Sequence, residues 1–218
     1  MDGDQFCFGT GKRGRSVTNT YERMAGEHLT RVFESPEPGL ADRLGAKRLG
    51  DTYRFSAFGQ TCQLSADGML LDKAPAAGVP ALLIALYARH AAAAEMVVEP
   101  LKAFVEMPDS GPYAAAFRSH SETLLVPHVA RILAHRDAIA ERFNGHPAPP
   151  EITGDWAILL QPLPKIALCY SFYAADEEFP PAAACLFSAN AAAFLPTDAL
   201  ADVAEYTGRA ILQLSASA

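Results

Sequence analysis

The sequence has few cysteines, and their spacing matches no common metal site. The four thiols are those of Cys7, Cys62, Cys169 and Cys185. None of them forms a C-x-x-C pair, so the patterns of zinc ribbons and of cysteine-ligated iron–sulfur centres are missing. Cys62 and Cys169 lie in apolar runs, where a free thiol usually acts as a small hydrophobe. This usage is typical of a reducing compartment.

Long apolar runs are also missing. No stretch approaches the roughly 20 apolar residues of a membrane-spanning helix. The N-terminus reads MDGDQFCFGTGKRGRS and has no apolar segment of the kind that a secretory signal needs. We therefore expect no membrane span and a cytoplasmic location.

The familiar signatures of catalysis are absent as well. The chain has no G-x-S-x-G elbow and no H-E-x-x-H, the motifs of many hydrolases and zinc peptidases. The stretch GTGKRG at 9–14 lacks the spacing of a phosphate-binding loop and the Ser or Thr that follows its lysine. We interpret it as part of a flexible basic arm. A catalytic triad dispersed along the chain stays open.

Basic side chains are too few to balance the acidic ones. The chain has 18 Lys and Arg against 25 Asp and Glu, a formal charge of −7. Residues 1–54 hold nine basic and eight acidic side chains, so the imbalance falls on residues 55–218, with nine and seventeen. An anionic surface repels phosphate backbones, which argues against nucleic acid as a partner. A cationic or neutral small molecule, or a protein partner, fits better.

The 218 residues are 50% hydrophobic, enough for a core of one domain.

The first 49 residues are expected to contain two helices. A helical pattern starts at Asn19, which has capping-box spacing to Glu22, and ends at the prolines of 34–39. A second short helix is expected over 40–49. From Tyr53 the apolar period becomes two, with turns at 58–59 and 67–68. We divide the chain into a flexible basic arm and N-terminal helix (1–39) and a single α+β domain (40–218).

The strongest strand pattern comes late in the sequence. Residues 155–173 alternate on both sides of QPLPK, which predicts a hairpin with its even-numbered side chains in the core and Lys165 exposed at the turn. Helices are expected over 80–95, over 125–143 and from Thr197 to the end, and strands over 101–107 and 182–187. The predicted fold class is α+β: an antiparallel sheet, made of a meander and a long C-terminal hairpin, covered by helices.

The stretch YAADEEFPP at 173–181 raises the main question about function. In an extended chain, Asp176 and Glu178 point to one side, where they could bind a divalent cation or one of them could serve as a general acid. The other reading is a hydrated strand end, in which Phe179 is buried and Pro180-Pro181 stiffen the exit. We favour the second reading, with the acids at the mouth of a pocket.

Aromatic residues next to this stretch are the candidate lining of that pocket. Tyr170, Phe172 and Tyr173 lie in or next to the last strand of the hairpin, and aromatic side chains bury a large area while keeping a polar end. Together with Asp176 and Glu178 they form most of the predicted ligand-binding set.

Histidines supply the rest of the candidate set. His128 lies on the same predicted helix as His135, and His120 precedes it by eight residues. Seven residues of helix span about 10 Å, which is too far for two imidazoles to share one metal ion. His90 follows an apolar stripe and is expected in the core, although an axial haem ligand would show the same pattern. Haem or another tetrapyrrole, and a divalent cation, stay open as cofactors.

Several stretches together resemble an uncharacterised bacterial and archaeal family, the domain of unknown function 3786. They are RLGAKRLGDTYRFSAFGQ, FVEMPDSGPYAAAF, GDWAILLQPLPKIALCYSFYAADEEFPPAAACLF and AAFLPTDALADVAEY. The similarity covers roughly residues 40–214. This chain has Tyr173 and Ala174-Ala175 where family members tend to carry Trp and Gly, and it lacks the cysteine-rich iron–sulfur segment to which they are often joined. The resemblance implies a role in anaerobic or redox metabolism.

Two functional hypotheses follow. The first is a non-catalytic accessory protein that binds a small molecule, a cofactor or a protein partner in an aromatic-lined pocket. The alternative is a metal- or carboxylate-dependent enzyme that uses Asp176 or Glu178 with a histidine. The first is favoured because no reaction signature is present, and a homodimer stays open.

Overall fold

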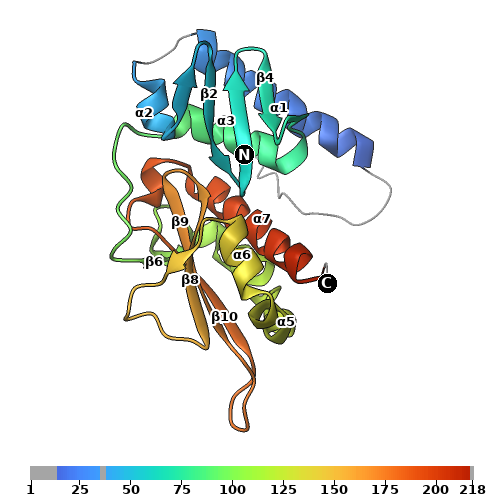
Figure 1. The fold of residues 1–218 in the computed structure, drawn as a ribbon, viewed down its shortest axis with the longest axis vertical. Helices are drawn as coiled ribbons and strands as arrows, with labels where there is room; N and C mark the ends of the chain where they lie inside the picture. Colours follow the sequence, from blue (N-terminus) through green and yellow to red (C-terminus); the bar gives the residue numbers. More distant parts are fainter. Residues whose placement is uncertain (1–13, 35–37, 217–218) are drawn as a thin grey trace.

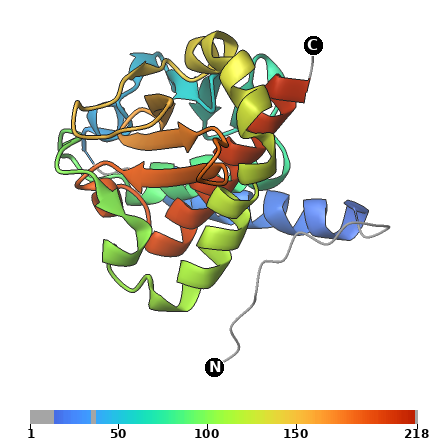
Figure 2. The ribbon, with the colours of Figure 1, turned by 90° about the horizontal axis from the view of Figure 1, so that it is seen from below.

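The computed structural model describes residues 14–34 and 38–216, and it has the predicted α+β architecture (Figure 1). Its strands form two five-stranded antiparallel sheets, one in each half of the molecule. Figure 2, a view from below, shows α7 crossing the middle of the molecule next to the strands of the second sheet. Most of the predicted basic arm, residues 1–13, lies outside the described residues, whereas residues 14–18 belong to the first helix.

The first sheet is the predicted meander. Its strands follow one another in sequence order and are β1 (Lys47–Leu49), β2 (Thr52–Ala57), β3 (Gln60–Ser65), β4 (Gly68–Leu71) and β5 (Ala74–Pro75). The tight turn between β2 and β3 has positive φ at both central residues, 52° at Phe58 and 71° at Gly59. A Cβ on Gly59 would lie 2.0 Å from the carbonyl oxygen of Arg142, so glycine is required there.

Helices α1 (Gly14–Glu34) and α3 (Gly78–His90) pack against each other next to the meander. Aromatic contacts join them to β2, since the Phe33 and Tyr53 rings are 6.2 Å apart and the Phe55 and Tyr87 rings 6.3 Å. The predicted helix over 40–49 is too long. Helix α2 covers Leu40–Leu44, because Gly45 has a left-handed φ of 61° and the chain then continues as β1.

The second sheet has the strand order β6-β10-β9-β8-β7. It contains the predicted hairpin of β8 (Trp156–Leu163) and β9 (Ile166–Tyr173), followed by β10 (Ala182–Phe187). Two short strands lie at its edges, β6 (Lys102–Ala103) and β7 (His146–Pro147). The even-numbered face of the hairpin is buried as predicted, and β9 is buried on its other face too, from Ile166 to Phe172.

The terminal helix α7 (Thr197–Ala216) packs against α3, α5 (Val129–Ala134), α6 (Arg136–Arg142) and the π-helix η3 (Arg118–Thr123). The two sheets meet where the backbone N–H of Phe58 donates to the carbonyl of Pro162 at 2.6 Å. The Phe58 ring also contacts the edge of the Tyr206 ring on α7, 4.7 Å away. The described residues therefore share one continuous core.

Three predictions about this part of the chain are corrected. The helix expected over 125–143 is interrupted at His135, between α5 and α6. The strand expected over 101–107 is reduced to β6, because a 3₁₀ turn, η1 (Phe104–Glu106), follows it directly. Lys165 is not exposed: its side chain is buried, and Nζ donates to the carbonyl of Ala94 at 2.7 Å.

Within the described residues, no helix has both the length and the apolar content to cross a membrane.

Candidate functional site

The loop between β9 and β10 projects from the lower end of the molecule (Figure 1). Phe179 lies in this loop with 66% of its surface exposed, and Asp176, Glu177 and Glu178 are exposed around it. The prediction that Phe179 is buried is therefore wrong. The loop extends past the rest of the sheet, so no other element of the described residues covers the ring.

Asp176 folds the acidic stretch into a turn. One oxygen of its carboxylate, Oδ1, accepts the backbone N–H groups of Glu178 at 2.9 Å and Phe179 at 2.7 Å. The backbone N–H of Asp176 donates in return to the carbonyl of Phe179 at 3.1 Å. The N–H of Phe179, followed by that of Glu178, holds the pKa of Asp176 below its usual range. The chain bends at 177–178, so Asp176 and Glu178 are not the two same-side carboxylates of an extended strand.

The base of the loop is fixed as well. The Asp155 carboxylate accepts the backbone N–H of Ala174 at 2.7 Å, and the backbone N–H of Asp155 donates to the carbonyl of Phe172 at 2.9 Å. The hydroxyl of Tyr173, a residue that is 40% exposed, donates to the carbonyl of Thr153 at 2.8 Å. Hydrogen bonds thus order both the base and the tip of the loop. We call residues 174–181, the loop of the hairpin that β9 and β10 form, the hairpin tip.

Tyr170 and Phe172 have no exposed surface. The Tyr170 hydroxyl donates to the carbonyl of Ala204 on α7 at 3.1 Å, and burial raises the pKa of that phenol well above its usual value. Phe172 stacks on Trp156 at 5.6 Å and on Tyr170 at 6.0 Å. Of the three predicted lining aromatics, Tyr173 alone reaches the surface. The ligand-binding role assigned to this set stays a prediction.

The histidines do not come together at a metal site. His128 is half-buried at the end of a 3₁₀ turn, η4 (Val126–His128), and His135 bonds through Nδ1 to the carbonyl of Arg131 at 2.8 Å. His90 is exposed at the last residue of α3, so its predicted place in the core is wrong. Over residues 14–34 and 38–216, no group of three or more His, Cys, Asp and Glu side chains is close enough to hold a metal ion.

A buried charged cluster on α7 was missed by sequence reasoning. The Glu205 side chain is 8% exposed, and its Oε1 accepts Nε and Nη2 of Arg209 at 2.9 and 2.8 Å. His120 of η3 places Nδ1 3.4 Å from the other Glu205 oxygen. The pair on α7 has a visible signal, a glutamate four residues before an arginine. His120 gives no such signal because it is distant in sequence.

Asp202 lies on the same helix, one turn before Glu205. Burial, and after it the charges of Glu205 and Asp198, raise the pKa of its carboxyl from 3.8 to about 7. Raised carboxyl pKa values are common at functional sites, although charged clusters with a structural role produce them too.

Two neighbours of His120 show that this region is structural. The Ser121 hydroxyl is fully buried and has no hydrogen-bond partner among the described residues, so no substrate can reach it. Glu122 accepts the backbone N–H of Cys185 on β10 at 3.1 Å, and burial raises the pKa of that carboxyl. Ser121, His120 and Glu205 are therefore not an accessible catalytic triad, and Glu122 ties η3 to the sheet.

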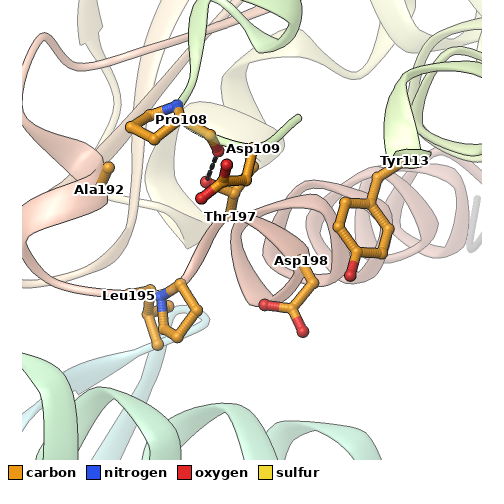
Figure 3. A pocket seen from close by; sticks show the side chains of 8 residues that line it. Pro108, Asp109, Tyr113, Ala192, Leu195, Thr197 and Asp198 are labelled. Atoms are coloured by element: carbon orange, nitrogen blue, oxygen red, sulfur yellow. Dashed lines mark hydrogen bonds between the residues drawn. The ribbon is translucent and has the colours of Figure 1, made fainter. Parts of the chain in front are cut away.

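A hollow of about 340 Å³ lies at the start of α7 (Figure 3). Its lining residues are Pro108, Asp109, Tyr113, Ala192, Leu195, Pro196, Thr197 and Asp198. The two carboxylates and the Tyr113 phenol suit a cation. The Thr197 hydroxyl, at the first residue of α7, donates to the carbonyl of Pro108 at 2.6 Å, so it has no free hydrogen for a ligand.

The three described cysteines, Cys62, Cys169 and Cys185, are free and buried. Burial raises the pKa of Cys62 to about 12 and that of Cys169 to about 11, and it raises the pKa of Cys185 strongly. These thiols are protonated at neutral pH and are poor nucleophiles.

A protein-family model described as "Domain of unknown function (DUF3786)" matches residues 37–210. The family model thus covers both sheets, α7 as far as residue 210, and the hairpin tip. No curated protein and no solved structure matches the chain.

Proposed function

The chain belongs to the DUF3786 family, and we propose that it is a non-catalytic accessory module that binds a protein partner through the hairpin tip. The observation that carries this proposal is the exposure of Phe179 at the end of an ordered turn. This is the accessory role expected from the sequence, with the binding element moved from an enclosed aromatic pocket to a projecting loop.

The unfavourable exposure of Phe179 to water supports a binding role for this side chain. Leaving a large apolar side chain in water forgoes about 1.5–3 kcal/mol of burial free energy. Phe179 is 66% exposed, while the nearby Phe172 and Tyr170 are fully buried. Aromatic side chains are enriched at the centres of protein interfaces, where a few residues carry most of the binding energy.

The order of the loop supports the same role. A flexible loop loses conformational entropy when it binds, and a loop already held in shape loses less. Asp176 bonds to the backbone N–H groups of Glu178 and Phe179, and Asp155 bonds to that of Ala174. These bonds fix the direction in which Phe179 leaves the turn, so the ring is presented before a partner arrives.

Charge defines the chemistry of the partner. Asp176, Glu177 and Glu178 give the tip three negative charges around one aromatic ring. A complementary surface has an apolar area for the ring with Lys or Arg side chains around it, and such charges speed association and select the partner. A nucleic acid lacks this surface, because its phosphates would repel the tip.

The enzymatic alternative is weaker on the same geometry. A general acid needs a raised pKa, and that of Asp176 is lowered by two backbone N–H groups. The redox-linked role that the family resemblance implies finds no reactive thiol among the described residues, since those thiols are buried and protonated. Both points support a module that binds a partner over an enzyme that catalyses a reaction.

Site-specific photo-cross-linking tests the proposal. A photoreactive phenylalanine analogue replaces Phe179 in the full chain, expressed in its own host. The control places the same analogue at Val105, which is 67% exposed in η1 and far from the tip along the chain. We expect a discrete cross-linked product from position 179 that position 105 does not give, and the purified partner should bind the unmodified chain. Identical products from both positions, or none from position 179, would overturn the proposal.

A further inference from the structure

The first sheet carries an exposed basic patch with an apolar side chain beside it. Lys47 and Leu49 of β1 point to the same side because they are two residues apart on a strand. Arg54 of β2 is the cross-strand partner of Lys47, so it lies on that side too. Leu49 is 57% exposed, and both basic residues are exposed. We call Lys47, Leu49 and Arg54 the basic patch.

The pairing of Lys47 with Arg54 is electrostatically unfavourable. Like charges directly opposite each other on neighbouring strands destabilise a sheet. Within the part of the chain that the structure describes, neither side chain forms an ion pair. Residues 47–54 contain three basic side chains and one acid, Asp51, for a net charge of +2 in a protein whose total charge is −7. An anionic partner would relieve the repulsion.

The hairpin tip is the complement of this patch. The charge of the tip is −3 and that of residues 47–54 is +2. Each has one large apolar side chain that is exposed, Phe179 in the tip and Leu49 in the patch. The two surfaces cannot meet within one molecule, because the meander forms the upper part of the fold and the tip its lowest point (Figure 1). We propose that the hairpin tip of one copy of this chain docks on the basic patch of a second copy.

This inference deepens the proposed function, on which it rests, by naming the partner as a second copy. The contact joins two different surfaces at opposite ends of the molecule, and we expect it to be head-to-tail, which leaves a free tip and a free patch at the ends of each assembly. A single loop buries little area, and small contacts are weak. The association should therefore depend on concentration and weaken with salt, because its charges are exposed.

Sedimentation velocity on the purified full chain, over a range of concentrations in low salt, tests the inference. We expect oligomers that grow with concentration and dissociate in high salt. Phe179→Ala should weaken self-association about tenfold or more, as loss of a central aromatic anchor does. The double variant Lys47→Glu with Arg54→Glu should be monomeric. The matched control, Lys73→Glu, changes a basic residue that is exposed in the turn between β4 and β5 and should leave association unchanged.

A charge exchange separates the docking contact from a general charge effect. The double variant Glu177→Lys with Glu178→Lys should be monomeric alone, and so should the patch double variant. An equal mixture of the two should associate again, because each tip then meets a patch of opposite charge. Mixed samples that stay monomeric, or wild-type protein that is monomeric at every concentration, would overturn the inference.

The outcome of cross-linking at position 179 distinguishes the two proposals. A product with a second copy of this chain supports both. A product with a different protein, together with monomeric wild-type chain, refutes docking on the basic patch and leaves the proposed function standing. If position 179 gives no specific product and the chain is monomeric, both proposals fail.

Discussion

Strand β9 and the hairpin tip that follows it each contain a phenylalanine, but the surroundings of the two rings are opposite. From Ile166 to Phe172 every residue of β9 is buried, on both faces of the strand. From Ala175 to Pro180 every residue is exposed. Phe172 has 0% of its surface exposed and Phe179 has 66%, although they are seven residues apart.

The difference shows that position relative to the sheet, rather than residue type, decides what an aromatic side chain does here. Tyr170 and Phe172 stack within the core under α7, where they stabilise the fold. Among the residues that the structure describes, none covers Phe179, and the turn built on Asp176 holds it outward. We infer that the body of the hairpin supplies stability and its tip supplies recognition. The predictions below test that division, starting with the largest effect.

The largest effect should come from Leu168→Asp in the body of β9. Leu168 is fully buried, and an unpaired carboxylate in the core is too costly for a small domain to tolerate. We expect no cooperative unfolding transition by circular dichroism. The matched variant Ala175→Asp, at the exposed start of the tip, should melt like the wild type. Equal melting temperatures for Leu168→Asp and Ala175→Asp would contradict the proposed division between a stabilising body and an exposed tip.

Truncating the two phenylalanines gives the sharpest contrast. Phe172→Ala should lower the free energy of unfolding by about 3–5 kcal/mol, the usual cost of removing a buried aromatic ring. Phe179→Ala should change it by less than about 0.5 kcal/mol, because the ring is already in water. Urea denaturation measures both values. A loss of several kcal/mol for Phe179→Ala would show that the ring is part of the core.

Lys165 tests the opposite end of β9, at the turn that joins this strand to β8. Its buried Nζ bonds to the Ala94 carbonyl and lies 5.7 Å from the centre of the Phe194 ring. Lys165→Asp should cost about 3 kcal/mol, since it removes this bond and buries a carboxylate beside a carbonyl oxygen. Lys165→Met keeps most of the apolar stem and should cost less. Equal melting temperatures for Lys165→Asp and the wild type would instead support the exposed turn that the sequence predicts.

Asp202 gives a smaller effect that depends on pH. Its pKa is about 7 in the folded protein and 3.8 in the reference state. Because the folded state binds the proton more tightly, stability should fall as pH rises from about 4 to about 7. Asp202→Asn should therefore raise the free energy of unfolding by about 1–3 kcal/mol at pH 8 and change it little at pH 4. A variant with the same pH profile as the wild type would contradict the shift.

The sequence predicted those parts of the fold that depend on local periodicity. Alternation identified β8 and β9 and the buried even face, and Phe58-Gly59 identified the first turn. The contacts of Lys165 and His120 could not be predicted in this way. In sequence, Lys165 is typical of an exposed turn, and its burial depends on a contact with Ala94, 71 residues earlier in the chain. His120 lies close to Glu205 because η3 packs on α7.

The candidate site was predicted in part. Phe179 is not helical, as expected for the residue before Pro180. The direction of the Phe179 ring depends on the turn, in which the Asp176 carboxylate accepts two backbone N–H groups. The extended strand that the sequence predicts does not contain this turn. Apolar character alone favoured burial, and the loop's projection beyond the sheet made that expectation wrong.

The most direct test of the division between body and tip is the effect of Phe179→Ala on the affinity for the partner captured at position 179. Isothermal titration calorimetry measures this affinity for the wild type and for Phe179→Ala, after urea denaturation has shown that the two proteins have the same free energy of unfolding. We predict that the affinity falls about tenfold or more. An unchanged affinity would contradict the claim that the hairpin tip is the recognition element.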